Sequence, residues 1–117
     1  MKHFELTEFE SPDHPGSGFK MNYDFLEMMD QARELTGRAI RINSGYRTPE
    51  HNESVGGLTT SSHLIGCAAD IACSTSTGRS ELIAALIGVG FRRIGIAKNF
   101  IHVDNDPNKV DAIWLYK

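Results

Sequence analysis

The stretch TSSHLIGCAADIAC (residues 60–73) contains the segment on which the fold of this chain depends. Its second half, residues 67–73, is short and mostly apolar and ends at a serine–threonine turn, which favours a buried β-strand. Successive side chains of a strand point to opposite faces. The odd-numbered residues, both cysteines included, are therefore expected to face the core. Asp70 then lies on the opposite face, between two alanines.

The two cysteines of the chain, Cys67 and Cys73, both lie in this strand. Six steps of about 3.3 Å place them about 20 Å apart, which is too far for a disulfide bond. Since they face away from Asp70, they do not share a metal or redox cluster with it. We therefore expect two free, buried cysteines that act as small apolar residues.

The composition is that of an ordinary globular protein, with 117 residues, 40% hydrophobic and 23% charged, and a net charge of −3. This length predicts one domain, residues 1–117, around one core. Without a basic stripe, nucleic-acid binding is not expected. The longest apolar run, 82–91, is too short for a membrane span, and the N-terminus lacks the apolar run of a signal peptide. We expect a monomer, cytoplasmic as synthesised, with neither nucleic acid nor membrane as partner.

Periodicity and capping residues predict the remaining elements. Asn22 is a candidate N-cap and Gly37 a stop signal for a helix whose buried stripe runs to Leu35. A second long helix is expected to bury Ile87. That helix is 79–88, and a short helix is expected at 49–54, after a Thr-Pro start. The predicted strands are 38–47, which runs into a turn at Ser44-Gly45, and 67–73, 91–97, 100–104 and 112–116. Because helices come early and strands cluster late, the class is α+β with a mostly antiparallel sheet.

Polar side chains interrupt two of these strands. An unpaired buried carboxylate is costly, so Asp70 needs a hydrogen-bond donor, an arginine or a cation. In the strand FIHVD the same alternation places His102 and Asp104 together on the face away from the core. His63 precedes Asp70 by a short glycine turn. Two histidines and one aspartate, with a fourth position left to water, are typical of catalytic zinc.

A simpler interpretation competes with the metal site. In it, Asp70 caps a turn or pairs with Arg47, and both histidines are ordinary surface residues.

Three sequence motifs carry a resemblance to a known family: SGYRTPEHN (44–52), SSHLIGCAADI (61–71) and FIHVD (100–104). They resemble the zinc D-alanyl-D-alanine carboxypeptidases, and most closely the small phage and bacterial branch, whose members cut peptidoglycan peptides. The resemblance implies a Zn²⁺ cofactor with His63, Asp70 and His102 as its ligands. It also implies the fold shared with the signalling domain of hedgehog proteins, a small antiparallel sheet packed by helices with the metal on the open face.

The resemblance also implies roles for two residues near the ligands. Arg47 corresponds to the substrate-binding arginine, which would hold a carboxylate or carbonyl oxygen and stabilise developing negative charge. Ser61, two residues before the first ligand, either hydrogen-bonds substrate or a ligand, or only shapes the turn.

The sequence departs from the family at one catalytic position. Many members carry an acid three residues before the last zinc histidine, and here that position is Asn99, which cannot transfer a proton. The nearest replacement is Asp104, either as the general base or as a carboxylate that orients His102. His51, on the short helix after Arg47, is the other candidate.

The resemblance implies a zinc metallopeptidase that cleaves D-amino-acid-containing peptide bonds of bacterial peptidoglycan, as a D,D- or L,D-carboxypeptidase or endopeptidase. Peptidoglycan stem peptides are the expected partners. An endolysin-like enzyme of phage or prophage origin, acting on the wall after release, fits the lack of a signal peptide. The alternative is a non-catalytic zinc-bearing peptidoglycan-binding module of the same fold, which Asn99 favours, whereas Arg47 and Asp104 favour the enzyme.

Overall fold

A five-stranded sheet organises the computed structural model, which describes residues 1–116. The strands are Ile42–Ser44 (β1), Ala68–Ala72 (β2), Arg93–Ile96 (β3), Phe100–Asp104 (β4) and Ala112–Leu115 (β5). Their order across the sheet is β1-β2-β4-β3-β5, and neighbours are antiparallel except β3 and β5, which are parallel. The predicted α+β class with a mostly antiparallel sheet is confirmed.

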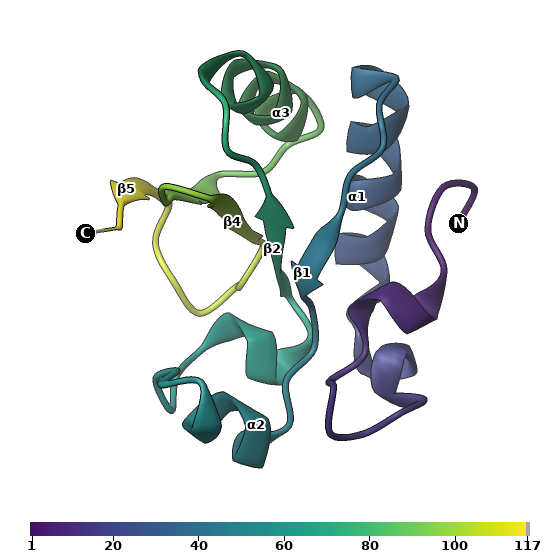
Figure 1. The fold of residues 1–117 in the computed structure, drawn as a ribbon, viewed down its shortest axis with the longest axis vertical. Helices are drawn as coiled ribbons and strands as arrows, with labels where there is room; N and C mark the ends of the chain where they lie inside the picture. Colours follow the sequence, from purple (N-terminus) through teal and green to yellow (C-terminus); the bar gives the residue numbers. More distant parts are fainter. Residues whose placement is uncertain (117) are drawn as a thin grey trace.

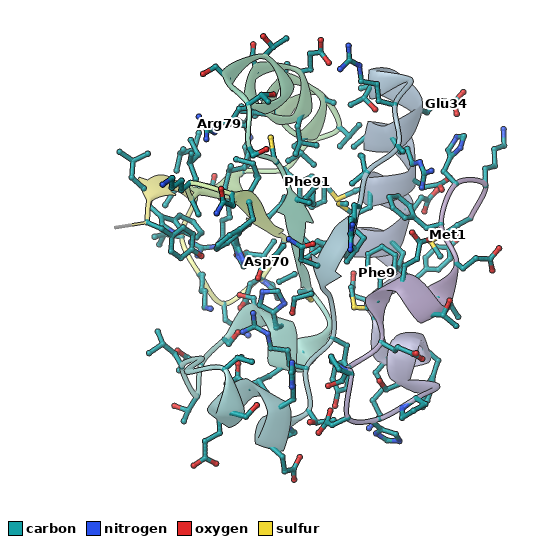
Figure 2. All side chains as sticks on the ribbon, viewed as in Figure 1. Met1, Phe9, Glu34, Asp70, Arg79 and Phe91 are labelled. Carbon is teal, nitrogen blue, oxygen red and sulfur yellow. The ribbon has the colours of Figure 1, made fainter. Side chains whose placement is uncertain are left out.

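Two long helices cover one face of this sheet. The helices are Tyr23–Thr36 (α1), Pro49–Ser54 (α2) and Ser76–Gly88 (α3), with 3-10 turns at Leu6–Phe9 (η1), Ser17–Lys20 (η2) and Ser62–Ile65 (η3). α1 and α3 pack against each other, whereas α2 lies at the opposite end of the molecule (Figure 1). In Figure 2, Phe91 lies between the two long helices and Phe9 lies close to β1, and both side chains are buried in the core.

Side-chain caps fix where the helices begin. The Asn22 side chain accepts a hydrogen bond from the Phe25 amide, and Gly37 ends α1 in the left-handed region, as predicted. Thr48 caps α2 in the same way. Thr75 accepts from the Gly78 amide, so α3 begins at Ser76, three residues earlier than predicted. The serine, threonine and glycine of that turn predicted a loop, but the cap stabilises them as helix.

Alternation along β2 and β4 separates an apolar face from a polar one. Ala69 and Ile71 belong to the buried core, together with Ile101 and Val103 of β4. Asp70 and its neighbours therefore lie on the face that α1 and α3 leave open. No described helix combines the length and apolar character needed to cross a membrane.

The prediction of two free, buried cysteines is confirmed for Cys67 and only in part for Cys73. Both thiols are free. Cys73 is half-buried and packs against the core. Cys67 is buried outside the core cluster, with Sγ 3.8 Å from the carbonyl of Ile65. Because β2 begins at Ala68, strand alternation does not extend to Cys67.

Three further expectations need correction. Leu35 and Ile87 are 62% and 44% exposed. The buried stripe of α1 ends at Ala32, and that of α3 ends at Leu86, so that Ile87 already lies on the outer side of its helix. The first strand spans only three residues, so it begins later in the predicted segment than expected. It ends where the chain turns toward the N-terminal segment and the Tyr46 amide donates to the Phe9 carbonyl at 2.8 Å.

The exposure of Leu35 yields a stability prediction. Met29→Ala is expected to lower the free energy of unfolding by about 2–5 kcal/mol, since Met29 is fully buried. Leu35→Ala should change it by less than about 0.5 kcal/mol. Urea unfolding of both variants measures this, and a loss at Leu35 equal to that at Met29 would contradict the packing described.

Candidate metal centre

The register of the sheet aligns four residues in one row across its open face. Asp70 on β2 pairs with His102 on β4, His102 pairs with Gly95 on β3, and Gly95 pairs with Trp114 on β5. Residues paired directly across strands share a face and lie side by side. Figure 2 shows the Asp70 side chain between the sheet and the segment that carries α2. The row therefore places a carboxylate, an imidazole and an indole in sequence.

His63 reaches this row from the 3-10 turn η3. Its Nδ1 lies 2.7 Å from the carbonyl oxygen of Gly45. Since a carbonyl oxygen only accepts, Nδ1 carries the proton and Nε2 keeps its lone pair, 3.3 Å from Oδ1 of Asp70. Gly45 is itself held by the N-terminal segment, because a Cβ there would lie 2.6 Å from the Phe9 carbonyl oxygen. The side chain of His63 is 3% exposed, so its orientation is fixed.

His102 is held on both sides of its ring. Nδ1 lies 3.0 Å from Oδ1 of Asp70, and Nε2 lies 2.7 Å from Oδ2 of Asp104. Each histidine thus turns one nitrogen toward Asp70 and the other toward an oxygen that accepts its N–H. Histidines that bind metals show this arrangement, in which the outer acceptor fixes the tautomer and the ring orientation.

The three side chains fit a zinc ion. Their candidate ligand atoms all lie within 4.8 Å of one another. A tetrahedral zinc with bonds of about 2.0–2.2 Å needs ligand atoms about 3.3 Å apart, and Asp70 lies 3.0 and 3.3 Å from the two imidazole nitrogens. Two nitrogens and one carboxylate oxygen also match the ligand types of a zinc site with one position left open.

The electrostatics of the cluster keep Asp70 ionised. Without a metal, burial by itself would raise the pKa of Asp70, but hydrogen bonds from the protonated rings of His102 and His63 outweigh it and hold the pKa well below its usual range. Burial likewise opposes the charged form of His102, yet hydrogen bonds to Asp104 and Asp70 raise its pKa. Asp70 is therefore ionised, and a metal ion bound there would replace the imidazole protons that face its carboxylate.

Arg47 forms an ion pair with Asp70 of the candidate ligand cluster (His63, Asp70 and His102) and lines the cleft beside it. Its guanidinium donates to Ser44 Oγ at 3.0 Å, Asn52 Oδ1 at 3.2 Å and Asp70 Oδ2 at 3.2 Å. A guanidinium has five N–H donors, so two remain for a ligand. The competing interpretation was right that Asp70 pairs with Arg47, but wrong about the histidines, which are buried rather than on the surface.

Asp104 is engaged through both carboxylate oxygens. Oδ1 accepts from Arg93 Nε at 2.8 Å and from the Asp106 amide at 3.1 Å, while Oδ2 contacts His102. The side chain is 1% exposed. Arg93 in turn lies over the Trp114 ring, 4.9 Å from its centre. Sequence reasoning missed Arg93, although alternation along its strand places it on the same face as Gly95.

Three other sequence candidates take different places. Ser61 caps η3 by accepting from the His63 amide, and it also lines the cleft. His51 lies on α2 and does not line the cleft. Asn99 is exposed and lines another cavity, of about 580 Å³, where its carbonyl accepts from the Cys73 amide. An acid at position 99 would therefore not line the cleft that contains the three candidate ligands.

The candidate ligand cluster of His63, Asp70 and His102 lies in a cleft of about 450 Å³. The other residues that line this cleft are Val55, Gly56, Gly57, Leu58, Ser62, Phe100, Lys109 and Tyr116. Apolar side chains thus lie beside the polar cluster, as in most sites for small ligands.

Comparison with known proteins gives one family. The family model described as Peptidase M15 matches residues 2–104, which include the three candidate ligands. In a comparison with curated proteins, no sequence matches this chain.

Removal of a candidate ligand tests the metal site. The purified protein is expected to bind one zinc ion per chain, and His102→Ala should abolish this binding, because it removes one of three ligands. His51→Ala is the matched control and should bind zinc as the wild type does. Zinc content after dialysis measures both, and unchanged zinc in His102→Ala would exclude the ligand assignment.

Proposed function

Because this chain belongs to the Peptidase M15 family, we propose that it is a zinc-dependent metallopeptidase that cleaves D-amino-acid-containing peptide bonds of bacterial peptidoglycan. His63, Asp70 and His102 are the proposed ligands. The observation that carries the proposal is the paired orientation of the two histidines: each turns one nitrogen to Asp70 and the other to an oxygen acceptor. A cluster built only as a salt bridge has no need of this arrangement.

Different residues of the cleft are proposed to bind the zinc ion and the substrate. A zinc ion bound by the cluster would polarise the scissile carbonyl and make water acidic enough to attack it near neutral pH. Arg47 has two N–H donors left beside Asp70 and is proposed to hold a substrate carboxylate or carbonyl oxygen by charge-assisted hydrogen bonds. Ser61 lines the same cleft and is proposed to contact the substrate backbone.

Asp104 is proposed as a positioning residue rather than as the general base. A general base needs an oxygen within reach of the proton that it takes. Both oxygens of Asp104 are held by His102, Arg93 and the Asp106 amide, and the carboxylate is buried. Its contact with Nε2 instead fixes the ring of His102 so that Nδ1 points to Asp70.

Asp104→Asn separates the two roles. As a positioning residue, Asp104 supports the metal, so the variant should bind zinc about 10- to 100-fold more weakly. Its turnover should recover substantially at saturating zinc. Asp111→Asn, an exposed change on the neighbouring loop, is the control. If instead zinc affinity is unchanged and kcat falls about 100-fold or more, Asp104 is the base.

Digestion of purified peptidoglycan tests the function itself. The zinc-loaded protein is expected to release new muropeptides, and a chelated sample should release none. Mass spectrometry of the products distinguishes carboxypeptidase from endopeptidase cleavage, and D,D from L,D bonds. A protein that holds one zinc ion and releases nothing would contradict the enzyme proposal.

One observation favours a second candidate, a zinc-bearing module that binds peptidoglycan without cleaving it. Among residues 1–116, the carboxylates that line the cleft are Asp70 and Asp104, and both are already engaged. Position 99, where many members of the family carry an acid, is an asparagine. Cosedimentation with insoluble peptidoglycan, without release of products, is the result that this candidate predicts.

A further inference from the structure

Gly95 makes room for two aromatic rings beside the metal cluster. A Cβ at this position would lie 2.6 Å from Cε2 of Tyr116 and 2.7 Å from Cε2 and Nε1 of Trp114. The indole and the phenol ring therefore lie directly on the backbone of β3, where any larger residue would displace them. The ring of Trp114 reaches His102 as a result, with ring centres 5.5 Å apart.

Three rings form a continuous aromatic wall, which we define as Phe100, Trp114 and Tyr116. The ring centres of Trp114 and Tyr116 lie 6.2 Å apart, and those of Tyr116 and Phe100 lie 5.3 Å apart. All three side chains line the cleft that contains the metal ligands. Tyr116 is 43% exposed, so the wall presents apolar surface to the cleft rather than to the core.

The charges of the cleft disfavour a cationic group against this wall. Among the described residues, two carboxylates line the cleft, and each forms an ion pair with an arginine: Asp70 with Arg47, and Asp104 with Arg93. Arg93 also lies over the Trp114 ring, so this cation-binding surface is already in use. An incoming ammonium group would find neither carboxylate free, and the lining cations Arg47, Arg93 and Lys109 would repel it.

Apolar side chains from another segment line the same cleft. Val55 and Leu58 lie between α2 and η3, and both are largely exposed. Exposed apolar residues on two separate segments around one cleft indicate a ligand with apolar groups of its own.

We propose that the aromatic wall is a specificity subsite, which takes an uncharged apolar side chain of the peptide residue next to the scissile bond. This inference rests on the proposed peptidase function. Trp114 and Tyr116 lie beyond residues 2–104, the segment that the family model matches. The family match therefore does not include two of the three rings of the wall.

Ketomethylene analogues of acetyl-D-Ala-D-Ala, in which CH₂ replaces the scissile NH, test the subsite without hydrolysis. Either alanine is replaced in turn by glycine, D-leucine or D-lysine. Trp114 is the only tryptophan of the chain, so its fluorescence reports binding at the wall of the zinc-loaded protein. At one of the two positions, the wild type is expected to bind the D-leucine analogue at least about 10-fold more tightly than those with glycine or D-lysine.

Variants of the wall should remove this preference while zinc stays bound. Gly95→Ala pushes both rings aside, and Tyr116→Ala removes one of them, so each should reduce the preference to less than about 3-fold. Leu115→Ala is the matched control, because Leu115 lies on the same strand, faces away from the wall and is 76% exposed. Circular dichroism and zinc content verify that each variant is folded.

Two results overturn the inference: a wild type without preference at either position, or a preference that both wall variants retain. If peptidoglycan digestion succeeds while the preference fails, the subsite alone is wrong. If neither digestion nor binding of any analogue occurs, the peptidase proposal fails and the subsite fails with it.

Discussion

The carboxylate of Asp70, held between two buried imidazoles, is the interaction on which the site depends. A carboxylate in an apolar strand is tolerated only when its charge is compensated, and here His63, His102 and Arg47 all contact it. The antiparallel register of β2 and β4 supplies one of these partners directly. The rest of the polar face is arranged to keep those partners in place.

The support for this contact extends outward in layers. Asp104 holds the ring of His102, Arg93 holds Asp104, and Trp114 lies against Arg93. On the other side, the carbonyl of Gly45 holds His63. The opposite face of the same strands packs into the apolar core beneath α1 and α3. A rigid sheet thus positions the ligands, whereas shorter segments at its edges supply the walls of the cleft.

Strand alternation was enough to find two of the three candidate ligands, Asp70 and His102, because it depends only on local sequence, whereas His63 lies in the 3-10 turn η3, outside the strands. It placed Asp70, His102 and Asp104 on one face, and the structure agrees. It could not find Arg93 or the aromatic wall, because these depend on which strands become neighbours and in what register. Periodicity also overestimated the burial of Leu35, since the end of a helix stripe is set by what packs against it. Capping chemistry, which is local, was read correctly at Asn22 but missed at Thr75.

The central claim is that one zinc ion binds at the three-residue cluster with a position left open. Anomalous diffraction at the zinc edge, from crystals of the zinc-loaded protein, tests it most directly. The account predicts a single strong peak bonded to His63 Nε2, Asp70 and His102 Nδ1, at about 2.0–2.2 Å, with water in the fourth position. A peak elsewhere, or a zinc ion enclosed by four protein ligands, would contradict the account.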